Sequence, residues 1–173
     1  MAIGPAIIHA VHPDYCMASW HRFYIDIWRV NTTIEGVRVL KAGFAKFAAE
    51  HPGGVGLLTI VEPRAPLPPS DARDALAAYL AEAAASIKYS AVVFEGDGFR
   101  AAAVRGVVTG LTLLARPPYP HKVFANVQQA VGWFSANFMD GNKPVVGTVE
   151  MVAAINELRK RIGSGQPRAT ARA

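Results

Sequence analysis

The sequence lacks the features by which membrane, secreted and disulfide-linked proteins are recognised. No window reaches the roughly 18 uninterrupted apolar residues that a membrane span needs. Cys16 is the single cysteine, so no internal disulfide can form, which fits a reducing compartment. The first ten residues have no basic residue before their apolar stretch, so we interpret them as a strand rather than a signal peptide. The sequence therefore predicts a cytoplasmic protein with no membrane partner.

Acidic residues are absent after position 158, and this absence accounts for the net charge of +5. Five of the 18 basic residues lie beyond that position, and the remaining 13 are balanced by the 13 acidic residues. These five are Arg159, Lys160, Arg161, Arg168 and Arg172. A folded nucleic-acid-binding domain carries its basic residues on one face, whereas cations at a helix end interact favourably with the helix dipole. We therefore expect no nucleic-acid partner.

Metal and cofactor motifs are also missing. The N-terminal region contains His9, His12, Asp14, Cys16 and His21. Zinc needs three or four ligands that converge on one point, and two histidines three residues apart in a strand face opposite ways. There are no paired cysteines, no His-Glu-x-x-His motif and no dinucleotide fingerprint of three spaced glycines. We predict no metal and no cofactor.

Apolar residues, in contrast, make up 51% of the chain, enough for the core of one domain. Apolar runs and alternation predict strands at 6–12, 20–30, 55–61, 91–94 and 121–125. Helical periodicity predicts helices at about 33–50, 70–87 and 99–115, another that follows Asn126, and a last one at 148–162. The predicted helix N-terminal signals are Thr32 with Glu35, Ser70 and Asn126, and Gly163 is the predicted stop of the last helix.

This alternation predicts an α/β fold with a four- to five-stranded mixed sheet and packed helices. The expected order is β-β-α-β-α-β-α-β-α plus a C-terminal helix, with the first two strands antiparallel and the rest parallel. Strands 55–61 and 91–94 are apolar on both faces and should be central. We divide the chain into an α/β domain at 1–147, a helix at 148–162 packed on it or on a partner subunit, and a flexible basic tail at 163–173.

The segment 92–100, Val-Val-Phe-Glu-Gly-Asp-Gly-Phe-Arg, forms a predicted strand, tight turn and helix start. With the element order over roughly residues 6–138, it resembles the STAS domain of anti-sigma-factor antagonists and their lipid-binding-like relatives, the STAS/SEC14 group. In antagonists this turn presents an Asp followed by a phosphorylatable Ser or Thr. Asp97 matches the Asp, but Gly98 stands in place of the hydroxyl residue, so the phospho-switch is not carried over. The resemblance implies an uncharacterised bacterial member of this group.

The turn at 96–98 is also the first candidate site. It lies at the carboxyl end of a predicted strand, where open α/β sheets bind ligands. The residues in question are Gly96, Asp97, Gly98, Phe99 and Arg100. Free N–H groups at the helix start, with Arg100 in its first turn, could hold an anion. The alternative is that the two glycines only make the turn.

Two apolar stripes are candidate interfaces. The first, on the predicted strand 20–30, consists of Trp20, Tyr24 and Trp28. The second, on the predicted last helix, consists of Met151, Ile155 and Leu158. Each stripe either packs within the chain or, if exposed, binds a partner, because aromatic residues dominate interface hot spots. A homodimer is one way to cover the second stripe, since most soluble oligomers are twofold.

No nucleophile, base or metal set converges in the sequence, so we do not predict an enzyme. Our first hypothesis is a non-catalytic signalling or protein-interaction module, and it rests on the resemblance. The second is a carrier or sensor of a small apolar or anionic ligand bound near the 96–100 turn. A third, an enzyme that uses Asp97, Arg100 or His121, has no defined reaction. The identity of the partner or ligand stays open.

Overall fold

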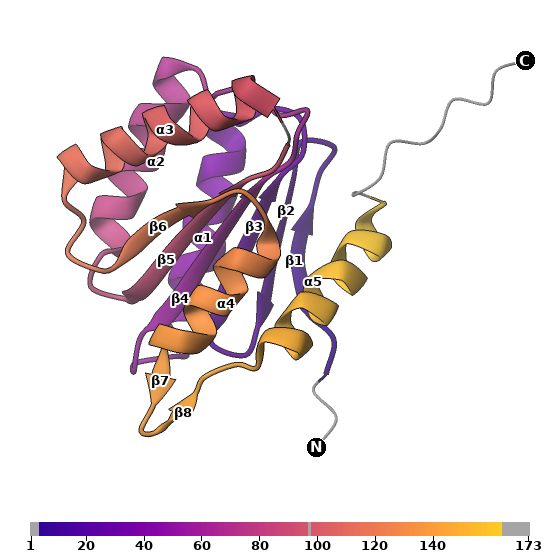
Figure 1. The fold of residues 1–173 in the computed structure, drawn as a ribbon, viewed down its shortest axis with the longest axis vertical. Coiled ribbons are helices and arrows are strands. Elements are labelled where there is room, and N and C mark those ends of the chain that lie inside the picture. The colour runs from indigo at the N-terminus through magenta and orange to yellow at the C-terminus, as the bar shows by residue number, and fades with distance from the viewer. Residues whose placement is uncertain (1–3, 97, 164–173) are drawn as a thin grey trace, which may run out of the picture.

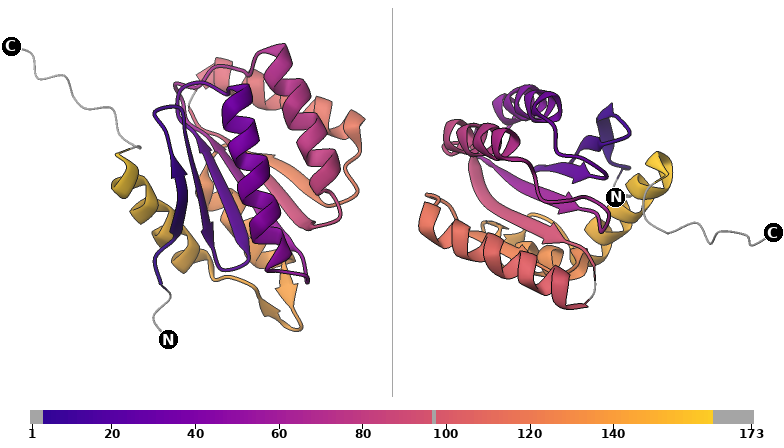
Figure 2. Two further views of the ribbon diagram at one scale, coloured as in Figure 1. Left: turned by 180° about the vertical axis from the view of Figure 1, so that it is seen from behind. Right: turned by 90° about the horizontal axis from the view of Figure 1, so that it is seen from above.

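The computed structural model describes residues 4–96 and 98–163, except for the side chains at 99, 100, 107 and 110–115. The centre of the fold is a mixed six-stranded sheet. Helices α1 and α2 lie on one face of this sheet, and α4 and α5 lie on the other (Figure 1; Figure 2). The strands, adjacent in chain order, are β1 (Ile7–Val11), β2 (Tyr15–Trp20), β3 (Phe23–Trp28), β4 (Val55–Val61), β5 (Ile87–Phe94) and β6 (His121–Phe124). The helices are α1 (Ile34–Ala49), α2 (Ser70–Ala83), α3 (Gly98–Ala115), α4 (Val127–Asn137) and α5 (Thr148–Ile162). A small hairpin of β7 (Met139–Asp140) and β8 (Lys143–Pro144) joins α4 to α5.

Within the six-stranded sheet, the strand that the sequence analysis missed is β2. It pairs antiparallel with β1 on one side and with β3 on the other, whereas β3 to β6 are mutually parallel. All six of its residues are buried, so it shows no polar alternation by which a strand is recognised. The sheet therefore has six strands rather than four to five, and the first two predicted strands are not neighbours.

A tight turn at His21 and Arg22 ends β2, so the predicted strand 20–30 was wrong at its start. His21 has a φ of 51°, in the left-handed region that non-glycine residues seldom adopt. The turn places Trp20 on the face under α4 and α5, while Tyr24 and Trp28 face α1 and α2. The predicted aromatic stripe is thus divided between two sides of the sheet.

Each face of the sheet has its own hydrophobic cluster. The cluster under α4 and α5 includes Phe23, Ile60 and Phe134, and the cluster under α1 and α2 includes Leu40 and Leu57. β4, which contributes to both clusters, is an interior strand as predicted. Two covered faces explain why the central strands are apolar throughout.

Helix α5 has the predicted bounds, and Gly163 ends it with a φ of 70°. Its apolar stripe of Met151, Ile155 and Leu158 is fully buried in the cluster that α4 and the sheet form. The chain's own core therefore covers the stripe, and no second copy is needed for that purpose. Residues 164–173 of the predicted tail lie outside the described residues.

The helix starts agree only in part with the sequence signals. Asn126 caps α4 as predicted, accepting a hydrogen bond from the backbone N–H three residues on. The cap of α1 is Thr33, whereas Thr32 was predicted, and the buried Thr32 lies before it. Ser70 is the first residue of α2, which has no side-chain cap.

Candidate functional site

The turn predicted as a site lies at the edge of the sheet where the parallel strands β3, β4 and β5 end, at the upper end of Figure 1. Gly96 and Gly98 have φ values of 125° and 88°, which L-residues rarely adopt. A Ser or Thr at position 98 would be strained, so the backbone itself favours the glycine found there. Asp97 and the side chains of Phe99 and Arg100 lie outside the described residues.

Three charged residues lie side by side next to this turn. Arg29, Glu62 and Glu95 directly follow β3, β4 and β5. The parallel ladder continues into them, because the N–H of Glu62 donates to the carbonyl of Trp28 at 2.9 Å and that of Glu95 to the carbonyl of Val61 at 3.0 Å. We call these three residues, with Arg159 of α5, the carboxyl-edge row.

Arg159 reaches the row from α5, which covers one face of the sheet. Its Nη2 donates to Oε2 of Glu95 at 2.7 Å, and the two side chains are only 14% and 19% exposed. From α3, Arg105 donates to the carbonyls of Phe94 and Gly96 at 3.1 and 3.3 Å. Two helices are thereby anchored to the end of β5 and to the start of the turn.

The row also contains buried polar atoms that have no hydrogen-bond partner among the described residues. They are Nε of Arg29, Oε1 of Glu62 and Nε of Arg159. An unsatisfied buried donor or acceptor costs about 1–3 kcal/mol, more for a charged group. These three atoms therefore lower the stability of the row unless a water molecule or another polar group reaches them.

Cys16 lies near this row, and its thiol is buried. Burial raises the pKa of its thiol to about 11, with a smaller effect of Glu62 in the same direction, and the positive charges of Arg29 and Arg161 only partly oppose this. A thiol that stays protonated at neutral pH has little of the reactive thiolate form.

Exposed apolar side chains also occur at the ends of elements on the same edge. In the described part of the chain, four of the seven exposed large hydrophobic residues lie there, with exposed fractions from 39% to 55%. They are Val11 at the end of β1, Val30 just after β3, Ile34 at the start of α1 and Leu67 between β4 and α2. β1 runs in the same direction as β3, because both are antiparallel to β2, so Val11 belongs to this edge.

The residues predicted as interfaces are elsewhere, inside the molecule. The buried set consists of Trp20, Tyr24, Trp28, Met151, Ile155 and Leu158. The N-terminal histidines also have local partners: Nε2 of His9 lies 2.8 Å from Oγ of Ser19, and His12 lies 3.4 Å from Asp14. Within residues 4–96 and 98–163, no three His, Cys, Asp or Glu side chains are grouped as metal ligands.

His121, the third residue of the enzyme hypothesis, is at the start of β6, opposite Ser90 of β5. Its Nδ1 lies 3.1 Å from Oγ of Ser90, and burial lowers the pKa of the imidazole to about 4. The side chain is thus neutral at physiological pH, and it lies several residues along β5 from the 96–98 turn.

A second buried polar group lies under α1. Asp26 of β3 is 1% exposed and accepts hydrogen bonds from Nε1 of Trp28 at 2.9 Å and from Oγ1 of Thr59 at 3.0 Å. Burial raises the pKa of this carboxyl to about 7, although the two hydrogen bonds oppose the change. The hydroxyls of Tyr24 and Tyr79, which pack nearby, are buried and have no partner.

The carboxyl-edge row was missed by the sequence analysis although it leaves a signal. Arg29, Glu62 and Glu95 are each the first charged residue after a strongly apolar strand. Parallel strands place their carboxyl ends at one edge, so three such residues could have been grouped in advance. The contribution of Arg159 could not, because this residue comes from a distant segment of the chain.

None of the helices in the described part of the chain has the length and apolar character needed to cross a membrane. Comparison of the chain with protein-family models, with curated proteins and with solved structures found no match. The resemblance to STAS domains therefore remains an expectation, and the site has to be interpreted from its own geometry.

Proposed function

We propose that this chain is a non-catalytic protein-interaction module, and that the partner protein binds at the carboxyl edge of β3, β4 and β5. The observation that carries the proposal is that exposed Val11, Val30, Ile34 and Leu67 lie at the same edge of the sheet as a row of charged residues. Protein interfaces combine an apolar centre with polar groups that fix orientation, and exposed apolar groups that gather in one region mark such sites.

The edge is also stiff, which favours binding. Leu67 lies in a loop that contains four prolines between residues 62 and 70, and proline restricts φ in the free chain. Arg105 and Arg159 hold the neighbouring turn from two sides. A surface that is ordered before binding loses less conformational entropy when the partner docks.

The STAS resemblance points to the same edge, because the 92–100 segment that carries it ends there. In antagonist members the corresponding turn is the regulated element. The glycine geometry at position 98 argues against the same phospho-switch here, so the proposed module would be regulated differently or not at all.

A second candidate function is binding of a small polar or anionic ligand at the same edge. The specific observation in its favour is the set of unpartnered atoms on Arg29, Glu62 and Arg159. Such a ligand would use the charged row and would have little need for the exposed apolar residues. This difference separates the two candidates by experiment.

The test is native mass spectrometry of tagged protein purified from its own host, in three versions. Leu67→Asp places a charge in the proposed surface, and Val149→Asp is the matched control, since Val149 is 78% exposed at the start of α5, away from this edge. Both sites are exposed, so both variants should fold.

We expect one stoichiometric protein to accompany the wild type and the Val149→Asp variant, and to be absent from the Leu67→Asp variant. Equal recovery of that protein with Leu67→Asp would refute the proposed surface. A small molecule bound in place of any protein would favour the ligand-binding alternative.

A further inference from the structure

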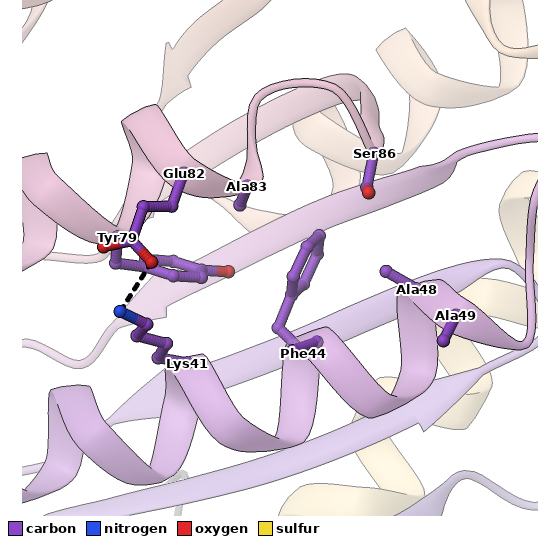
Figure 3. A pocket seen from close by; sticks show the side chains of 9 residues that line it. Lys41, Phe44, Ala48, Ala49, Tyr79, Glu82, Ala83 and Ser86 are labelled. Carbon is purple, nitrogen blue, oxygen red and sulfur yellow. Dashed lines mark ion pairs between the residues drawn. The ribbon is translucent and has the colours of Figure 1, made fainter.

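A cavity of about 320 Å³ opens between α1 and α2, remote from the carboxyl edge (Figure 3). The side chains around it come from the C-terminal halves of both helices, at residues 41–49 and 79–86. Small-molecule sites occupy roughly 300–1,000 Å³, so the cavity suits a ligand at the small end of that range.

Most of the cavity wall is apolar. It is formed by Phe44 and by the small side chains Ala45, Ala48, Ala49 and Ala83, and Ser86 adds one hydroxyl group. Alanines on facing helices leave space that larger side chains would fill. A hydrocarbon or aromatic group would therefore be removed from water here without clashing with the helices.

One polar group at the inner end lacks a partner. Tyr79 is 2% exposed, and its hydroxyl is buried without a hydrogen bond. Figure 3 shows the Tyr79 ring entering the cavity from α2 with its hydroxyl directed toward the Phe44 ring of α1. The hydroxyl has almost no exposed surface, so a ligand oxygen that enters between the two helices reaches it only when the side chains around it shift.

The mouth of the cavity carries no net charge. Lys41 of α1 and Glu82 of α2 form an ion pair across it at 2.5 Å, and both side chains are more than half exposed. Exposed ion pairs of this kind are weak and rearrange easily. The ion pair can therefore open to admit a ligand to the cavity. It has no unbalanced charge that would attract an ionic ligand.

From this geometry we infer a second binding site between α1 and α2 for a small uncharged molecule that is mainly apolar and carries one hydrogen-bonding oxygen. The apolar part lies against Phe44 and the alanines. The oxygen accepts a hydrogen bond from the Tyr79 hydroxyl, which gives that buried group the partner it lacks. The site is independent of the proposed interaction edge, because it shares no residue with it.

The test uses para-cresol as the probe and toluene as its analogue without the oxygen. Titration of the ¹⁵N-labelled protein should give saturable shifts of backbone signals within 41–49 and 79–86 and none within α5. Toluene should bind about 3- to 10-fold more weakly, the range expected for one neutral hydrogen bond. Tyr79→Phe should make the two affinities equal.

Two filling variants and one control complete the design. Ala48→Leu and Ala83→Leu extend into the cavity from opposite helices, and each should weaken para-cresol binding at least about tenfold. Ala153→Leu, at an exposed position of α5, adds the same group outside the cavity and should leave binding unchanged. Circular dichroism shows which variants are folded.

Three results would overturn the inference. The first is an absence of saturable shifts around the cavity in the wild-type protein. The second is unchanged para-cresol affinity in a folded filling variant. The third is a preference for para-cresol over toluene that persists in Tyr79→Phe.

Discussion

Gly43 provides the sharpest test of how α1 packs on the sheet. It faces the ring of Tyr24 on β3, and a Cβ added at Gly43 would collide with the Tyr24 hydroxyl oxygen, whereas the next ring atom, Cζ, would be 3.2 Å away. That hydroxyl is buried and has no hydrogen-bond partner. The collision therefore depends on one oxygen atom that contributes no hydrogen bond of its own.

The magnitudes follow from two opposing effects of Gly43→Ala. Forcing an extra methyl group into a packed core costs about 1–3 kcal/mol, and replacing glycine by alanine inside a helix recovers up to about 1 kcal/mol. We expect a net loss of about 1–2 kcal/mol in the free energy of unfolding. With Tyr24→Phe present, the nearest ring atom is Cζ at 3.2 Å, which needs a shift of only a few tenths of an ångström. The same substitution should then stabilise the protein by up to about 1 kcal/mol.

The assay is urea denaturation followed by far-ultraviolet circular dichroism for the wild type, both single variants and the double variant. Tyr24→Phe alone should be close to neutral, because the hydroxyl it removes has no partner. Gly132→Ala in α4, where a Cβ meets nothing within 4 Å, is the control and should be stabilising by about 0.5–1 kcal/mol. Additive effects of the two substitutions, within about 0.5 kcal/mol, would refute the packing argument.

Three further predictions concern other parts of the molecule. The folded-state pKa of Asp26 is raised to about 7 against about 3.9 in the unfolded chain, so its contribution to stability is complete below about pH 4 and is lost as the pH rises through about 7. This change in the free energy of unfolding is on the order of a few kcal/mol, and Asp26→Asn should remove it. Denaturation of both proteins at a series of pH values is the measurement, and an equal change of the free energy of unfolding with pH in both would contradict the prediction. Leu158→Ala should cost about 2–5 kcal/mol, because this side chain of α5 is fully buried against α4 and the sheet, while Val149→Ala should change stability by less than about 0.5 kcal/mol in the same melts. Cys16 should react with a thiol reagent at pH 8 only after unfolding, because burial raises its pKa to about 11, and rapid labelling of the native protein would show that the region opens.

Much of the architecture follows from signals that act over a few residues. The bounds of α5 agree with its apolar period and with Gly163, whose positive φ ends the helix. The cap at Asn126 and the doubly apolar β4 are equally local, since a cap bonds within one turn and a covered strand has no polar face. Gly96 and Gly98 were placed correctly after β5 for the same reason, because glycine tolerates their positive φ angles.

Other features arise from contacts between segments that are distant in the chain. β2 looks like a connection in the sequence, and it is a strand because β1 and β3 satisfy its backbone on both sides. The aromatic stripe was assigned to one face, and the turn at His21 divides it, because a shift of one residue reverses the side of every later side chain. The partner of Glu95 is Arg159 from α5, 64 residues further along the chain. Pairing of this kind depends on how helices dock on the sheet, and no local pattern of residues encodes it.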